Sequence, residues 1–287
     1  EVIDDMCEKG EVDLVEAISQ PFPLLVICDM MGIPRSEYST VLDATNVILG
    51  GGDPEFLDGK DLIPALFEAG ITLKTLMNEL AAERRANPTD DLTSKLVNAE
   101  HGEDMLTPDE LGSFFILLAV AGNDTTRTAT SLGMHLLGQN PDERRAWQDD
   151  IDGLTATAVD EIVRMASPVT YMRRTVTRPL TLSGQDFETG DRLIMFYGAA
   201  NRDPRVFDDP ERFDVRRDPN PHVGFGGPGP HFCLGAHLAR RELAVVFRQI
   251  LTRLPDIEVT GSPDFLDSLG PPLVGGVKRL PVRFTPT

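Results

Sequence analysis

Residues 223–237, VGFGGPGPHFCLGAH, hold five glycines, two prolines, two histidines and one cysteine in fifteen positions. Proline removes a backbone donor, and glycine raises the entropic cost of regular structure, so this stretch cannot form a continuous helix or a central strand. It has to fold as a shaped loop around the thiol of Cys233, and the rest of the chain has to support that loop.

The residues that follow, LGAHLARREL, begin a helix, which places Cys233 close to a helix N-terminus. Unpaired N–H groups and the helix dipole favour an anion there, so the position favours a thiolate. The glycines also let backbone N–H groups approach the sulfur closely. A thiolate serves as a nucleophile or as a metal ligand; the alternative is a cysteine that is buried and only packs.

Composition excludes several classes of protein. Of the 287 residues, 41% are hydrophobic and 25% are charged, and the longest apolar run, around residues 114–121, is too short to span a membrane. A formal charge of -19 argues against a general nucleic-acid binder. Three cysteines without C-x-x-C spacing indicate a reducing, cytoplasmic compartment. Because the chain opens on Glu1 rather than Met and shows no signal-peptide pattern, we expect it to be part of a longer protein.

Hydrophobic periodicity and the positions of Gly and Pro predict helices within residues 13–34, 61–88, 106–141, 156–168 and 237–254. Between residues 173 and 204, β-branched alternation interrupted by Gly184 and Gly190 predicts short strands and turns, and the tail predicts a final strand pair. We therefore expect a mainly α fold with a small β portion, organised as one domain over residues 1–287.

The third predicted helix carries the clearest start signal. Thr107 is placed to act as N-cap, Pro108 occupies the first helical position, and Glu110 follows three residues after the cap. The apolar stretch from residue 111 to residue 121 is nearly continuous, which predicts a helix that is buried on most sides.

Within that helix lies AGNDTT, residues 121–126. Asn, Asp and Thr are poor interior helix formers, and an aspartate in a buried helix needs a partner or a task. One interpretation is that Gly122 ends one helix and Asp124 caps the next. The other is a local opening of the helix that presents Asp124 and Thr125 to a ligand as a proton-handling acid and alcohol.

A third pattern is EIVR, in which Glu161 and Arg164 are three residues apart and share one helix face. By itself this spacing is weak evidence, because most such pairs are solvated and contribute little.

Together, and in this order, the AGNDTT helix, the Glu-x-x-Arg pair and the Gly-rich His-x-Cys-x-Gly loop resemble the haem-thiolate monooxygenases of the cytochrome P450 family. The stretch ANRDPRVFDDPERFDVRRDPNPHVGFGG, which precedes and enters the loop, resembles bacterial members of the family. The family's aromatic residue stands seven positions before the cysteine, where this chain has Gly226, and Phe225 lies one position further upstream. The resemblance implies the cytochrome P450 fold without its amino-terminal part.

The resemblance also implies a role for each matching residue. Cys233 matches the thiolate ligand of the haem iron. The other residues that it places at the cofactor are His231, Arg174, Phe225, Gly229, Gly235, Ala121 and Gly122. Asp124 and Thr125 match the catalytic acid–alcohol pair on the oxygen side. A buried, structural Glu-Arg-Arg network is matched by Glu161, Arg164 and Arg212.

The implied cofactor is haem b, and the implied reaction inserts one atom of dioxygen into a hydrophobic small molecule of the sterol, terpene or branched-lipid class. The residues expected to line an apolar pocket are Leu117, Leu118, Ala121, Val169, Thr170 and the tail loop SLGPPLVGG. Arg240, Arg241 and Arg248 lie on the helix after Cys233, which suggests a basic surface for an acidic, ferredoxin-type electron donor. Without an amino-terminal part, we expect the pocket to be open on one side and apolar helix faces to be exposed.

Two other functional classes compete with this one. A non-catalytic haem-thiolate sensor, or an inactive fragment, would use the same ligand, but a sensor needs no proton relay such as Asp124 and Thr125. A Cys–His hydrolase would pair Cys233 with His231 or His237. That pairing is disfavoured, because a histidine two residues away on a Gly/Pro loop is poorly placed to act as the base.

Overall fold

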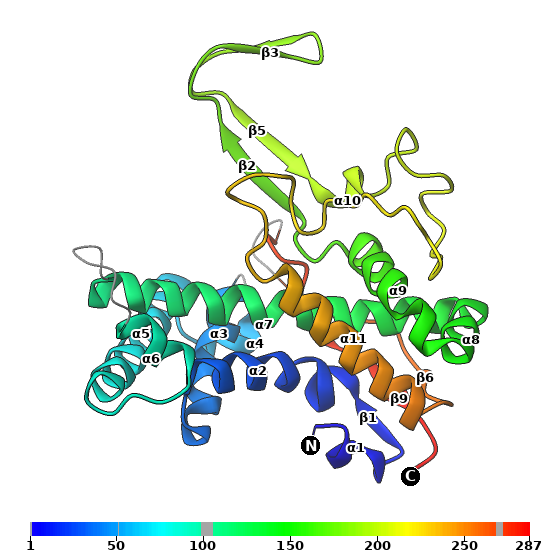
Figure 1. The fold of residues 1–287 in the computed structure, drawn as a ribbon, viewed down its shortest axis with the longest axis horizontal. Coiled ribbons are helices and arrows are strands. Elements are labelled where there is room, and N and C mark those ends of the chain that lie inside the picture. The colour runs from blue at the N-terminus through cyan, green and yellow to red at the C-terminus, as the bar shows by residue number, and fades with distance from the viewer. Residues whose placement is uncertain (1, 51, 99–105, 268–271) are drawn as a thin grey trace.

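Helix α7 (Pro108–Gln139) runs across the width of the molecule, and most of the other helices pack on it (Figure 1). The structure is a computed structural model that describes residues 2–50, 52–98, 106–267 and 272–287. The remaining helical elements are α1 (Asp4–Cys7), the π-helical turn η1 (Val15–Ser19), α2 (Pro21–Met31), the 3-10 turn η2 (Arg35–Glu37), α3 (Tyr38–Leu49), α4 (Pro54–Leu57), α5 (Leu62–Ala86), α6 (Leu92–Val97), α8 (Pro141–Asp149), α9 (Ile151–Ala166), α10 (Tyr197–Ala200) and α11 (Ala236–Arg253).

The helix boundaries follow local chemistry, as the sequence predicted. At the start of α7 the Thr107 hydroxyl accepts the Glu110 N–H (3.2 Å), and the Glu110 carboxylate accepts the Thr107 N–H (2.9 Å), which completes the expected capping box. Helix α2 begins at Pro21 and ends at Gly32, whose φ of 76° is left-handed and favours glycine. The predicted mainly α fold is confirmed.

The strands are short, and apart from β1 and β9 the paired strands lie close together in the sequence. They are β1 (Glu11–Asp13), β2 (Tyr171–Thr175), β3 (Leu180–Leu182), β4 (Gln185–Phe187), β5 (Arg192–Phe196), β6 (Glu258–Val259), β7 (Asp264–Phe265), β8 (Val277–Arg279) and β9 (Pro281–Arg283). The sheets have the orders β1-β9-β6, β2-β5, β3-β4 and β7-β8, all antiparallel. Figure 1 shows β2–β5 and β3–β4 projecting from the helical body. The sequence predicted the later strands but not β1, which forms by pairing with β9 from the far end of the chain.

Two apolar clusters flank the centre of α7. Phe115 and Ala119 belong to a cluster with α2, α3 and α5, whereas Ala129 and Met134 belong to one with α9, α11 and both ends of the chain. Residues 121–128, AGNDTTRT, lie between these clusters. The polar segment of α7 therefore lies where the two cores meet.

The first half of α7 is less buried than the sequence predicted. Leu117 is 59% exposed and Ala121 is exposed, and they are four residues apart on the same face of the helix. A second exposed apolar row on α5 consists of Ile63, Phe67 and Ile71. The expected exposed apolar faces are thus present. No helix in the described ranges combines the length and apolar character needed to cross a membrane.

Candidate functional site

The cysteine loop is held by turns that need glycine at two positions. Gly226 and Gly229 have φ values of 86° and 134°, which residues with a Cβ rarely adopt. The Cys233 N–H donates to the Phe225 carbonyl (3.0 Å), which closes the loop, and α11 begins three residues later at Ala236. Cys233 is exposed, whereas Cys7 and Cys28 are buried. The glycines thus shape the loop, and the thiol lies on its surface before a helix N-terminus, as predicted.

The base of the loop rests on α9 and α11. The Gly224 N–H donates to His222 Nδ1 (3.1 Å), and His222 Nε2 lies 3.4 Å from Asp160. Arg240 bonds the same Asp160 (2.7 Å), and its guanidinium lies 4.4 Å from the centre of the Phe225 ring. Phe225 therefore packs on the α11 side of the loop, next to a cation. His222 was missed by the sequence analysis, although it stands inside the stretch quoted for the resemblance.

Glu161 and Arg164 form the buried centre that supports this region, and neither side chain is exposed to solvent. Arg164 donates twice to Glu161, both at 2.8 Å, and its other N–H groups reach the carbonyls of Asn201 (2.7 Å), Pro210 (2.7 Å) and Arg212 (3.0 Å). All five guanidinium donors are therefore used. The pair is a structural centre rather than a solvated surface pair.

The prediction that the Arg212 side chain belongs to this network is wrong. The Arg212 side chain is 60% exposed and only approaches Glu143 and Asp214, both at 3.7 Å. The second arginine at Glu161 is Arg217, whose Nε donates to the carboxylate (3.2 Å) and whose side chain is 11% exposed. Arg212 contributes its main-chain carbonyl instead, because the chain passes the network at residue 212 with the side chain turned outward and returns at residue 217.

Asn201, which is fully buried, joins this network to the cysteine loop. Its carbonyl accepts from Arg164, and its Oδ1 accepts the Val223 N–H (2.8 Å), where the loop begins. Asn201 and Arg217 were not among the predicted site residues. Their only sequence signal is their place in the same quoted stretch.

The predicted opening of α7 at AGNDTT is absent, and so is the alternative helix break at Gly122, because α7 is continuous through these residues. The Thr125 hydroxyl donates to the Ala121 carbonyl one turn earlier (2.7 Å), so a side chain that was expected to interrupt the helix lies along it. Asp124 is 3% exposed. Burial raises the pKa of Asp124 to about 6, and Arg127, 3.5 Å away, opposes that shift.

Helix α11 joins the cysteine loop to this segment of α7. The Thr126 hydroxyl donates to the carboxylate of Glu242 on α11 (3.2 Å), and both residues are buried. Burial also raises the pKa of Glu242 to about 7. At about 1.5 Å of rise per residue, the six residues from Ala236 to Glu242 span about 9 Å. The helix that follows the thiol-bearing loop thus contacts α7 at Thr126, the residue after the Asp124–Thr125 pair.

The predicted pocket-lining residues are brought together in part. Thr170 bonds the carbonyl of Leu273 (2.9 Å), and Val169 bridges to Val274, so these residues and the tail loop do lie together; residues 268–271 of that loop fall outside the described ranges. Arg174 is exposed on β2. Hydrogen bonds between Cys233 and His231 or His237, as a hydrolase would need, are absent from the described part of the chain.

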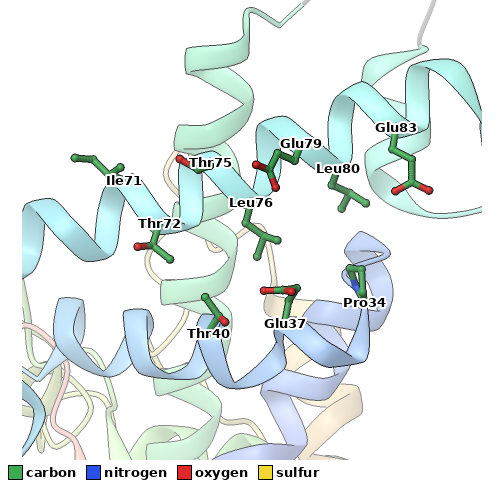
Figure 2. A pocket seen from close by; sticks show the side chains of 10 residues that line it. All are labelled: Pro34, Glu37, Thr40, Ile71, Thr72, Thr75, Leu76, Glu79, Leu80 and Glu83. Carbon is green, nitrogen blue, oxygen red and sulfur yellow. The ribbon is translucent and has the colours of Figure 1, made fainter.

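The residues at Cys233 fit a flat apolar group with a metal at its centre. Phe232 is 45% exposed and Leu234 is 78% exposed, so the thiol stands between two uncovered apolar side chains. In the described ranges no three His, Cys, Asp or Glu side chains are grouped to hold a bare metal ion. A groove of about 500 Å³ between α3 and α5, lined by Glu37, Glu79 and Glu83 among others, is separate from these residues (Figure 2).

Comparison with known families agrees with this geometry. A family model described as Cytochrome P450 matches residues 64–264, which include Asp124, Glu161 and Cys233. The chain belongs to the cytochrome P450 family. Members of this family carry haem on a cysteine thiolate.

Two similar relatives are named as a lipid hydroxylase and a steroid monooxygenase. The chain is 46% identical to a methyl-branched lipid omega-hydroxylase of Mycobacterium tuberculosis, over 96% of this chain and 63% of that protein. It is 38% identical to a steroid C26-monooxygenase of Mycolicibacterium smegmatis, over 96% of this chain and 62% of that protein. The chain therefore spans slightly less than two thirds of the length of these relatives.

Solved structures of cytochromes P450 match the fold over nearly the whole chain. A Mycobacterium marinum cytochrome P450 in complex with pseudoionone has a TM-score of 0.92 and 42% identity, covering 99% of this chain and 68% of that one. A Bacillus megaterium member in complex with testosterone has a TM-score of 0.88 and 30% identity, with coverage of 99% and 75%.

Proposed function

We propose that this chain carries the thiolate ligand and the proton-handling pair of a haem monooxygenase, which inserts one atom of dioxygen into a hydrophobic small molecule. The observation that carries this proposal is the exposed Cys233 thiol on a rigid loop, one helix crossing away from Asp124 and Thr125. We propose further that residues 1–287 form the carboxy-terminal two thirds of a single domain.

The proposed cofactor is haem b, with Cys233 as its ligand. Contacts around it are proposed for His231, Arg174, Phe225, Gly229, Gly235, Ala121 and Gly122. A thiolate-bound haem supplies oxygen activation, because electron density from the sulfur favours O–O cleavage. The chain contributes the ligand, the shape of the loop and the apolar surface of Leu117, Phe232 and Leu234.

Asp124 and Thr125 are the proposed acid and alcohol. Asp124 suits proton transfer because its pKa, raised by burial to about 6, lies close to neutral pH. In this arrangement the Asp124 carboxyl holds a proton, and the Thr125 hydroxyl, now directed at the Ala121 carbonyl, passes it on.

The proposed substrate is a branched lipid or a sterol. The two relatives named above act on such molecules. The exposed apolar side chains of Leu117 and Leu273 support an apolar substrate surface. The three free cysteines are consistent with our placing the protein in the cytoplasm.

The carbon-monoxide difference spectrum of the reduced full-length protein tests the proposal. We expect a red-shifted Soret band typical of thiolate ligation, and spectral shifts when branched fatty acids or sterols are added. A full-length protein that binds no haem would overturn the proposal, whereas haem with no response to these lipids would overturn only the substrate class.

An acidic ferredoxin is the proposed electron donor, and Arg241 is the best test residue on α11. Arg240 and Arg248 are already paired with Asp160 (2.7 Å) and Asp152 (2.6 Å) on α9, so they provide less free positive charge than the sequence suggested. Arg241 is exposed and has no ion pair among the described residues. Replacing it with glutamate should slow reduction by a ferredoxin about tenfold at low salt, with the effect vanishing at high salt.

The matched control is Arg192→Glu, an exposed arginine on β5 in the projecting hairpins. Reduction of this variant should proceed at the wild-type rate. Equal rates for the Arg241 variant and wild type at every salt concentration would contradict a donor site on α11.

A further inference from the structure

Arg127 lies at the centre of the molecule, one turn after Asp124 on α7, and its side chain is 3% exposed. Its Nε donates to the Val277 carbonyl on β8 (3.2 Å), and its Nη1 donates to Asn46 Oδ1 on α3 (3.1 Å). A single guanidinium thus ties three elements together beside the proposed acid.

The contact between Arg127 and Asp124 is ionic but not a hydrogen bond. Their charged atoms are 3.5 Å apart, and Asp124 Oδ1 is buried without a hydrogen-bond partner among the described residues. A buried, unpaired carboxylate oxygen costs free energy, so it will accept any donor that turns toward it. One of the two N–H groups on Nη1 of Arg127 donates to Asn46, and this bond holds the guanidinium where Nη1 stays 3.5 Å from Oδ1.

The charges around this pair come from several elements. Asp13 at the end of β1 and Glu55 on α4 act on the Arg127 charge together with Asp124. Lys278, which follows Val277 on β8, lies 3.7 Å from Glu55 and 3.1 Å from Asp53. On the α11 side, Glu242 accepts from Thr126. Asn46, in contrast to these charged groups, carries no charge.

We propose that Arg127 is a positioning residue for Asp124, and that the Asn46 side chain on α3 controls how strongly Arg127 holds the acid. The proposal rests on the proposed function of Asp124. While Asn46 accepts from Nη1, Asp124 has only the charge of Arg127 and keeps its proton more readily. When Asn46 turns away, the guanidinium is no longer held in place and can move so that Nη1 donates to Oδ1, which favours the ionised form of Asp124.

Asn46 can respond to events at the surface, because it is only partly buried. It also lines a cavity of about 510 Å³ between α3, α4 and α5, together with Glu55 and Phe56. A shift of α3, or a molecule in this cavity, would therefore reach Asp124 through two side chains.

Infrared spectroscopy of the full-length, haem-loaded protein tests the proposal without measuring turnover. The C=O band of the protonated Asp124 carboxyl is the band that is missing in Asp124→Asn. The loss of this band in the wild type as the pH rises gives the midpoint at which Asp124 ionises. Arg127→Gln should move the midpoint upward by one to three pH units, because an opposite charge is lost. Asn46→Ala should move it downward by about one pH unit, because the guanidinium is freed to move toward Oδ1 and donate to it. Arg127→Lys, which keeps the charge, should stay closest to wild type.

Shifts of opposite sign distinguish this role from a merely structural one, which would lower stability in both variants and leave the midpoint in place. Equal midpoints, or shifts in the same direction, would overturn the proposal. If Arg127→Gln does not fold, the downward shift in Asn46→Ala decides alone. The catalytic role of Asp124 is tested separately by the product formed per dioxygen consumed in Asp124→Asn. An unchanged ratio would refute the proposed function of Asp124. The infrared midpoints would still decide whether Arg127 and Asn46 set the charge of Asp124.

Discussion

Replacing Cys233 with serine in the full-length protein is expected to abolish the thiolate Soret band and all monooxygenase activity. A serine hydroxyl does not ionise near neutral pH, and it lacks the soft sulfur that haem iron needs for this chemistry. Because Cys233 is exposed and its loop is held by backbone hydrogen bonds and glycine turns, the fold should survive the change. The carbon-monoxide difference spectrum measures the first effect, and circular dichroism checks the second.

Cys28→Ala is the matched control, because Cys28 is a free cysteine that is fully buried in the cluster with α3 and α5. The Soret band should remain unchanged in this variant. A thiolate band that persists in Cys233→Ser, or disappears in Cys28→Ala, would mean that Cys233 is not the ligand.

The second large effect is expected at Glu161. Glu161→Gln should lower the free energy of unfolding of the full-length protein by about 3–5 kcal/mol, because it leaves Arg164 and Arg217 buried without a counter-charge. Besides the two arginines, the carboxylate accepts the Asp214 N–H (2.9 Å) and the Asn220 side-chain amide (3.1 Å). A glutamine NH₂ would face these donors with donors of its own. Chemical denaturation monitored by tryptophan fluorescence provides the measurement.

The pair Asp142 and Arg145 offers a control with the same spacing of three residues, but with side chains that are 89% and 63% exposed. Asp142→Asn should leave stability unchanged within error, because exposed pairs contribute little. If the two substitutions have equal effects, the Glu161 network does not stabilise the fold in the way that its geometry indicates.

Much of the secondary structure could be predicted because its signals are local. The Thr107–Glu110 capping box, Pro21 at the start of α2 and Gly32 at its end act within one helical turn, so the sequence contains the whole interaction. Strand β1 could not be predicted in this way, since its three residues are stabilised only by β9, about 270 positions away.

The candidate site likewise has a part that local sequence predicts and a part that tertiary contacts decide. Local sequence patterns and their order identified Cys233, Asp124, Glu161 and Arg164 as candidate residues, and the family comparison agrees with the resemblance on which their roles rest. Their environments were decided by tertiary contacts. Helix α7 is continuous through AGNDTT, where Thr125 bonds along the helix and Thr126 bonds to α11, although Asp124 Oδ1 has no hydrogen-bond partner among the described residues.

By itself, the sequence determined that a glycine-rich loop must carry a thiol before a helix, and that the chain is mainly helical. Both follow from backbone sterics and local hydrogen bonds. Only the tertiary structure decided that Arg217 rather than Arg212 reaches Glu161, that Arg240 and Arg248 are already paired, and that Arg127 joins α3 to Asp124. The physical reason is that a buried charge is satisfied by whichever donor the folded chain brings within about 3 Å, and that donor can come from any part of the sequence.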